Sequence, residues 1–256
     1  MTAWSYFFIA VGFLLWGVIV IPLTIVLSRF WPGVRDWFSD CTHAALSLFV
    51  KLLPILKLRV DRGERVRNGP CVLVGNHQSW LDPIVMFSLE RRLSGPARGY
   101  LFRTPVIRSV LKLGHFYLSE SGEPAPLDRM RLGVQDAIER GGTLLFYPEG
   151  TRTRTGDIGD FRLGAFRMAV EYKLPLQPVV IDGLDRVFPP GSIITQTQSR
   201  YLVQVRYLDP VEPPHGEGPQ RGVVRELAKR VRLAMVQALS ELRMERQSAE
   251  KPLGSD

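Results

Sequence analysis

The sequence predicts an α/β fold with a mainly parallel central sheet flanked by helices, preceded by an N-terminal hydrophobic, membrane-anchoring helical segment. From about residue 57 onward, short apolar runs alternate with helical stretches, as strands linked by crossover helices do. Several runs are apolar throughout, which is typical of strands buried on both faces of a parallel sheet. Before them, residues 1–28 contain no charged side chain.

The N-terminal segment is long enough to be an anchor. Residues 6–27 are nearly all apolar, and about 20 such residues let a helix cross a bilayer. The segment lacks the basic start of a cleaved signal peptide, so we expect it to be retained, with a buried core helix as the alternative. Pro22 interrupts the run, and a second, broken apolar stretch follows at residues 44–56. Residues 1–56 are therefore predicted to form a membrane anchor, either one span or a helical hairpin in one leaflet.

The charge balance narrows the choice of partners. A net charge of +8 indicates an anionic partner, such as nucleic acid, an anionic lipid or a phosphorylated substrate. No basic motif interleaved with aromatic residues is present, so we expect no nucleic-acid partner. Basic residues follow the first apolar run, which favours a cytoplasmic location for the rest of the chain. Cys41 and Cys71 fit neither a disulfide framework nor a zinc motif.

Residues 57–247 are predicted to form the α/β domain, and residues 248–256 a disordered tail. Strands are predicted at residues 56–60, 71–76, 98–102, 115–119, 143–148, 176–182 and 201–208. Helices are predicted at residues 83–93, 105–113, 127–140, 162–173 and 221–244. The last helix is amphipathic, which favours packing on the domain, with docking on a membrane surface as the alternative.

A histidine and an aspartate follow the apolar run in "CVLVGNHQSWLDP", residues 71–83. The predicted strand ends near Gly75, and ligands of α/β folds bind beyond the carboxyl ends of strands. Asp82 opens the next helix, where it is suited either to cap that helix or to fold back toward His77. A carboxylate bonded to one ring nitrogen would fix the imidazole tautomer and leave the other nitrogen as a base.

A second polar stretch follows a buried strand in "LLFYPEGTRTRTGDIGDFRLGAF", residues 144–166. Arg152 brings a fork of donors that suits a phosphate, and Gly150 allows a close approach of the backbone. A solvated basic loop would have the same composition. From the residues alone, two interpretations of this loop remain: an anion-binding site or a solvated basic loop.

Together the two stretches resemble the motifs of the glycerolipid acyltransferases. "NHQSWLD" at residues 76–82 is similar to the family's N-H-x-x-x-x-D motif, and "YPEGTR" at residues 147–152 to its F-P-E-G-T-R motif. "LPLQPVVIDG" at residues 174–183 is similar to a later motif. The resemblance covers roughly residues 45–210 and is nearest to bacterial 1-acylglycerol-3-phosphate acyltransferases. The pair of motifs about seventy residues apart is a strong signal, whereas N-H-x-x-x-x-D alone is weak.

The resemblance implies a membrane-bound enzyme that moves a fatty acyl group to the hydroxyl of a lysophospholipid. His77 would be the general base on that hydroxyl, and Asp82 would orient it. The donor would be acyl-CoA or acyl-carrier protein, and the acceptor first of all 1-acylglycerol-3-phosphate, giving phosphatidic acid. The resemblance implies no cofactor and no metal, and a place at the bacterial inner membrane. The substrate-binding residues would be Arg103, Glu149, Gly150, Thr151 and Arg152.

One position departs from the family pattern. The family's middle motif commonly reads G-x-x-F-I-x-R, whereas this chain has "GHFYLSE", with Glu120 at the place of the arginine. A carboxylate there would repel a phosphate, unless Arg129 or Arg131 compensates. Two alternatives follow: an acyltransferase for another lysolipid, or a membrane-anchored lipid-binding protein without turnover.

Overall fold

The protein is described by a computed structural model in two units. The described residues are 11, 16–31, 33–53, 55–63, 69–119, 126–153, 155–187, 200–214, 216 and 218–250. Unit 1 comprises Met1–Pro54 and Ile84–Leu145, and unit 2 comprises Ile55–Pro83 and Phe146–Asp256. Residues 84–145 thus group with the N-terminal helices, whereas the sequence predicts one α/β domain over residues 57–247. The structure is an α/β fold with a mostly parallel sheet flanked by helices.

Unit 2 carries four neighbouring strands in the order β1-β8-β7-β2. They are β1 (Leu56–Asp61), β2 (Cys71–Gly75), β7 (Leu176–Asp182) and β8 (Tyr201–Tyr207). Every residue of β2 and β7 is buried, as their continuous apolar character predicts, whereas β1 alternates between exposed and partly buried residues. The β1–β8 and β2–β7 pairs are parallel, and the β7–β8 pair is antiparallel. The predicted sheet is therefore mainly, not wholly, parallel.

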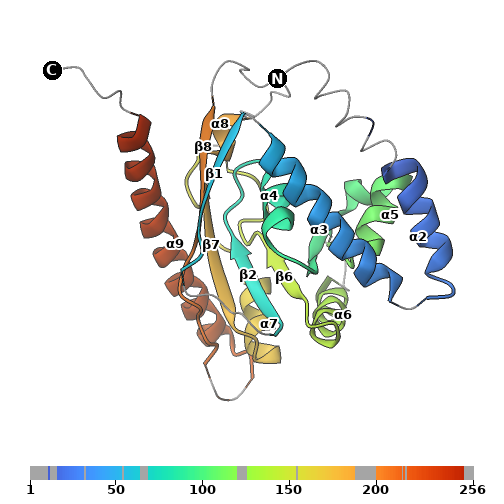
Figure 1. The fold of residues 1–256 in the computed structure, drawn as a ribbon. Coiled ribbons are helices and arrows are strands. Elements are labelled where there is room, and N and C mark those ends of the chain that lie inside the picture. Colours follow the sequence, from blue (N-terminus) through green and yellow to red (C-terminus); the bar gives the residue numbers. More distant parts are fainter. Residues whose placement is uncertain are drawn as a thin grey trace. The chain divides into compact units, whose positions relative to one another are not determined.

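Helices α7 (Gly164–Tyr172), α8 (Leu184–Val187) and α9 (Arg221–Glu250) complete unit 2. In Figure 1, α9 is the long red helix that runs beside β7 and β8. Its apolar stripe is buried at Val224, Val231, Met235 and Leu242, which agrees with packing on the domain.

Helix α9 extends past the predicted end at residue 244 and includes residues 248–250 of the predicted tail. The extra turns are held by contacts far away in the sequence. Arg206 of β8 donates to Glu245, and Arg246 donates to Asp182 of β7. Residues 251–256 lie outside the described residues.

Unit 1 begins with the short helix η1 (Trp16–Val20) and the helices α2 (Ile21–Leu27) and α3 (Val34–Leu52). Ile21 of α2, Phe38 of α3 and Leu113 of α5 (Pro105–Leu113) form a buried apolar cluster. Among the described residues, no helix is both long enough and apolar enough to cross a membrane. Residues 1–10 and 12–15, which include part of the predicted anchor run, lie outside the described residues.

The rest of unit 1 alternates short strands and helices. They are α4 (Asp82–Leu89, which begins in unit 2), β3 (Leu93–Ser94), β4 (Pro96–Arg98), η2 (Gly99–Arg103), β5 (Tyr117–Ser119), α6 (Pro126–Glu139) and β6 (Thr143–Phe146, which ends in unit 2). Strands β3 and β6 pair in parallel, as do β4 and β5. The strand predicted at residues 98–102 is wrong: β4 ends at Arg98, and a 3₁₀ helix starts at Gly99. The three residues of β5 pair with Pro96–Arg98, and residues 99–102 pair with no strand in the part of the chain that the structure describes.

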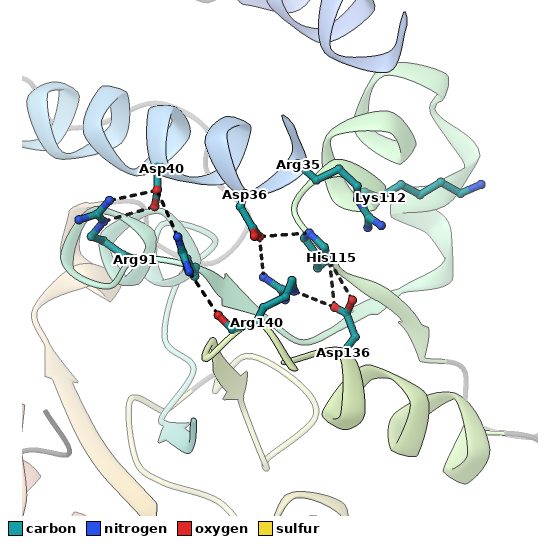
Figure 2. A network of polar contacts seen from close by, with 9 residues as sticks. Arg35, Asp36, Asp40, Arg91, Lys112, His115, Asp136 and Arg140 are labelled. Carbon is teal, nitrogen blue, oxygen red and sulfur yellow. Dashed lines mark hydrogen bonds and ion pairs between the residues drawn. The ribbon is translucent and has the colours of Figure 1, made fainter. Parts of the chain in front are cut away.

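A polar network in unit 1 joins α3, the turn after α5, and α6 (Figure 2). His115 has a side chain only 6% exposed, and its Nδ1 lies 2.9 Å from Oδ2 of Asp136. Arg140 donates from Nε to the same carboxylate oxygen, at 3.1 Å. Asp36 of α3 lies 3.8 Å from Nε2 of His115 and 3.5 Å from Nη1 of Arg140. Burial, aided by the charges of Arg140 and Arg35, lowers the pKa of His115 to about 4, so its imidazole is neutral at pH 7.

Candidate active site

The polar stretch after β2 starts with Asn76, whose side chain makes the hydrogen bonds that the backbone of a strand would make. Asn76 is 1% exposed, and its amide group makes two hydrogen bonds with the backbone of Ile181 in β7. Nδ2 donates to the Ile181 carbonyl at 2.9 Å, and Oδ1 accepts from the Ile181 amide at 2.8 Å. Asn76 thereby replaces the ladder bonds at the end of β2, and the chain leaves the sheet with His77 at its carboxyl edge.

His77 and Asp82 form the pair that their spacing suggests. Nδ1 of His77 lies 2.7 Å from Oδ2 of Asp82, and that oxygen also accepts the backbone amides of Gln78 at 2.6 Å and Ser79 at 2.7 Å. An ionised carboxylate only accepts, so Nδ1 carries the hydrogen and Nε2 is left to take a proton. The carboxylate points back along the loop toward the imidazole. Of the two roles that the sequence suggests for Asp82, helix cap or partner of His77, this geometry agrees with the second.

The two members of the pair differ in exposure. The side chain of Asp82 is completely buried, whereas that of His77 is 20% exposed. Burial raises the pKa of Asp82 above its ordinary value, and the hydrogen bonds from His77 and from the Ser79 and Gln78 amides oppose that shift. The ring of Tyr147 stacks on the His77 imidazole with centroids 4.4 Å apart. The imidazole is thus fixed by a hydrogen bond at one edge and by a ring on one face.

Glu149 of the second motif hydrogen-bonds to the backbone of the first motif. Its Oε1 accepts the backbone amide of His77 at 2.9 Å, and its Oε2 accepts the backbone amide of Gly159 at 2.9 Å. The amide of Thr153 in turn donates to the carbonyl of His77 at 2.8 Å. Both oxygens of Glu149 therefore bind backbone, and its predicted contact with the acceptor stays a prediction.

The loop after Glu149 surrounds an open depression of about 360 Å³ whose lining includes Thr151 and Arg152. Arg152 is exposed and makes no ion pair with any other residue that the structure describes. Gly150 has φ +71°, and a Cβ there would lie 2.6 Å from Nε of Arg162. Glycine is thus required both for the turn and for the guanidinium beside it. An exposed arginine on an open depression is suited to an anionic group.

The structure brings six of the seven predicted site residues together in unit 2: His77, Asp82, Glu149, Gly150, Thr151 and Arg152. The seventh, Arg103, is exposed at the end of η2 in unit 1, and its role stays a prediction. Glu120 lies outside the described residues. Among the described residues, no group of histidine, cysteine and acidic side chains is arranged to hold a metal ion.

Sequence reasoning did not assign roles to Asn76, Tyr147 or Gly159. Asn76 stands beside His77 in the motif, so its position alone was a usable signal. Tyr147 was counted as the end of a buried strand, and its ring contact with His77 comes from a residue 70 positions away. Gly159 contributes only a backbone amide, which no pattern of side chains reveals.

A base is oriented by a carboxylate, and its backbone bonds to Glu149 and Thr153 of the loop that carries the exposed Arg152. This arrangement is equipped to activate a hydroxyl in an anionic molecule. The family comparison agrees: residues 57–182 match the model of the Acyltransferase family. The chain thus carries an acyltransferase-family domain, and both motifs lie within it.

Individual relatives point the same way. The chain is 29% identical over 184 residues to a chloroplastic 1-acyl-sn-glycerol-3-phosphate acyltransferase of Brassica napus, covering 69% of this chain and 53% of that protein. It is 28% identical over 235 residues to a 1-acyl-sn-glycerol-3-phosphate acyltransferase of Saccharomyces cerevisiae, covering 89% and 73%. The chain thus spans about half the length of the plant relative.

The fold also matches a solved structure, the 1-acyl-sn-glycerophosphate acyltransferase PlsC from Thermotoga maritima. The TM-score is 0.67, the sequence identity is 22%, and the match covers 93% of each chain. The likeness establishes that the two chains share the acyltransferase fold.

Proposed function

We propose that this protein is an acyltransferase that acylates 1-acylglycerol-3-phosphate to phosphatidic acid, with acyl-CoA or acyl-carrier protein as donor. The observation that carries the proposal is the 2.7 Å hydrogen bond between His77 and Asp82 at the end of β2. It sets the imidazole as a base within the matched family domain. The names of the relatives from Brassica napus and Saccharomyces cerevisiae support the choice of acceptor.

In the proposed reaction, Nε2 of His77 removes the proton of the acceptor hydroxyl as its oxygen attacks the thioester carbonyl. The new carbon–oxygen bond forms, the carbon–sulfur bond breaks, and the imidazolium returns the proton to the departing thiolate. Asp82 holds the ring and stabilises the imidazolium during the step. No acyl-enzyme is needed, because the acceptor itself is the nucleophile.

The acceptor phosphate is proposed to bind at the depression beside Arg152. Two of the three acidic side chains on its lining have an arginine of α9 nearby: Arg243 bonds to Asp157 at 2.7 Å, and Arg232 lies 3.8 Å from Asp160. The third, Glu149, bonds to backbone amides. Arg152 then supplies the positive charge and the fork of donors that a phosphate accepts.

A membrane location follows from the nature of the acceptor, which carries a fatty acyl chain. Large apolar side chains on α2, α3 and the turn between them are exposed, as expected of a surface that meets lipid: Leu23, Val26, Phe30, Leu48 and Leu52. We propose that this region and the apolar residues before it form the anchor. Removal of residues 1–56 is expected to release the chain from sedimented membranes.

The direct test is an acyl-transfer assay with the purified full chain in mixed micelles. Lysophosphatidic acid, lysophosphatidylcholine and lysophosphatidylethanolamine are offered with oleoyl-CoA, and products are identified by mass spectrometry. We expect phosphatidic acid to form fastest. Faster acylation of another lysolipid would move the acceptor assignment, and Glu120→Arg is the variant that then tests whether Glu120 sets the preference. Absence of any product with acyl-CoA and with acyl-carrier protein donors would contradict the proposal.

A further inference from the structure

Helix α9 contacts the loop after β6, which hydrogen-bonds to the backbone of His77. The residues of α9 lie far beyond both sequence motifs. Arg232 donates from Nε to the carbonyl of Gly159 at 2.7 Å and from Nη2 to the carbonyl of Ile158 at 3.0 Å. Its guanidinium thus grips two successive carbonyl groups of this loop. The ion pair with Asp160 adds little, because the Asp160 side chain is fully exposed.

The peptide between Ile158 and Gly159 is the centre of this arrangement. Its carbonyl oxygen accepts from the cationic Arg232, and its N–H donates to Oε2 of the anionic Glu149 at 2.9 Å. Charged partners strengthen hydrogen bonds, and bonds in a chain polarise one another. One peptide group therefore links the arginine of α9 to the glutamate of the E-G-T-R motif.

The same glutamate holds the backbone of His77. Oε1 of Glu149 accepts the His77 amide at 2.9 Å, while the Thr153 amide donates to the His77 carbonyl at 2.8 Å. The backbone position of His77 is thus set by this loop, whereas its ring orientation is set by Asp82 and Tyr147.

We propose that Arg232 is a positioning residue for the base, acting through the 158–159 peptide and Glu149 on the backbone amide of His77. Its loss lets Glu149 shift, which displaces the imidazole from the acceptor hydroxyl. Displacements of about 1 Å reduce turnover by as much as ~10²-fold. The catalytic consequence rests on the proposed function, whereas the structural link to His77 does not.

The link is measured first without any activity. The chain has only four histidines, so protein labelled with [15N]histidine gives a readable set of backbone amide signals. Arg232→Gln is expected to move the His77 amide signal and to leave those of His43 and His115 in place. Arg225→Gln, at an exposed arginine of the same helix, is the matched control and is expected to move none of the three.

Turnover is then measured as a double-mutant cycle. Arg232→Gln is expected to lower kcat about tenfold or more, with Arg232→Lys recovering part of the loss because the charge remains but the two-pronged grip does not. If Arg232 acts through Glu149, Arg232→Gln added to Glu149→Gln costs little further turnover.

The outcomes separate the two proposals. An unmoved His77 signal in Arg232→Gln overturns the link, as do multiplicative effects in the cycle. A moved signal with unchanged kcat overturns the positioning role. If the wild-type chain transfers no acyl group at all, the proposed function fails, while the amide signals still decide whether α9 controls His77.

Discussion

Among the residues that the structure describes, two histidine–aspartate pairs have similar geometry and different surroundings. Nδ1 lies 2.7 Å from the carboxylate in His77–Asp82 and 2.9 Å in His115–Asp136. In the first pair the aspartate is buried and the histidine is partly exposed, next to an aromatic ring. In the second the histidine is buried and a guanidinium, that of Arg140, contacts the shared carboxylate (Figure 2).

The difference teaches that a short hydrogen bond to a carboxylate does not by itself make a histidine a base. The carboxylate of Asp136 is shared with Arg140, and burial, aided by the charges of Arg140 and Arg35, lowers the pKa of His115 to about 4. Its Nε2 is buried and faces Asp36. By contrast, the Asp82 carboxylate accepts hydrogen bonds, among the described residues, only from His77 and from two backbone amides. The ring of His77 also reaches the surface. Access and local charge distinguish the candidate base from the structural histidine.

The largest expected effect comes from removing each imidazole. His77→Ala is expected to lower kcat by ~10²–10⁴-fold, the usual loss for a general base, with the melting temperature little changed. His115→Gln, which keeps a donor for Asp136, is expected to retain most of the activity per folded molecule. Both are measured by initial rates corrected for the folded fraction. If His77→Ala kept half of the wild-type rate, the assignment of His77 as the base would be wrong.

The carboxylates give the next contrast. Asp82→Asn keeps an oxygen for the Gln78 and Ser79 amides but no longer fixes the His77 tautomer, so kcat is expected to fall by roughly 10²-fold or more. Asp136→Asn removes one of the two carboxylates beside Arg140 and is expected to lower stability rather than kcat. Thermal melts and rates on the same samples separate the two. A loss of stability without a loss of turnover in Asp82→Asn would reduce Asp82 to a structural role.

The buried His115 also predicts a dependence of stability on pH. The pKa of His115 is about 4 in the folded chain against the ordinary 6.5 of a histidine, so between these values the unfolded chain binds a proton that the folded chain does not. Stability therefore falls as the pH falls from about 6.5 to about 4, and the gap corresponds to roughly 3 kcal/mol. Urea unfolding at several pH values measures it. His115→Gln is expected to flatten this part of the profile, and an equal slope in both proteins would refute the assignment.

The smallest effect concerns an arginine that is exposed, in contrast to the enclosed Arg140. Arg152→Lys keeps the charge and loses the fork of donors, so the KM for lysophosphatidic acid is expected to rise about fivefold, the equivalent of one hydrogen bond. The KM for the acyl donor is expected to stay the same. A change confined to the donor would place Arg152 at the thioester side of the site.

Much of the fold was readable from local pattern. The continuous apolar runs predicted β2 and β7, and the helical periodicity predicted α5, α6 and most of α9, because burial of one face or of a whole strand is written in adjacent residues. The short strand β4 was misplaced because pairing depends on a partner strand that lies elsewhere in the chain. For the same reason the sequence did not predict that β8 runs antiparallel to β7.

The sequence by itself determined the candidate base and its carboxylate, because His77 and Asp82 are five residues apart and a single loop is enough to bring them together. It also placed Glu149 and Arg152 after a second strand. Only the tertiary structure decided what surrounds them: Asn76 bonded to β7, Tyr147 stacked on the imidazole, and Arg232 reaching the loop from α9. These contacts join residues separated by 70 to 105 positions, and the packing of the sheet and helices, not local spacing, brings them together.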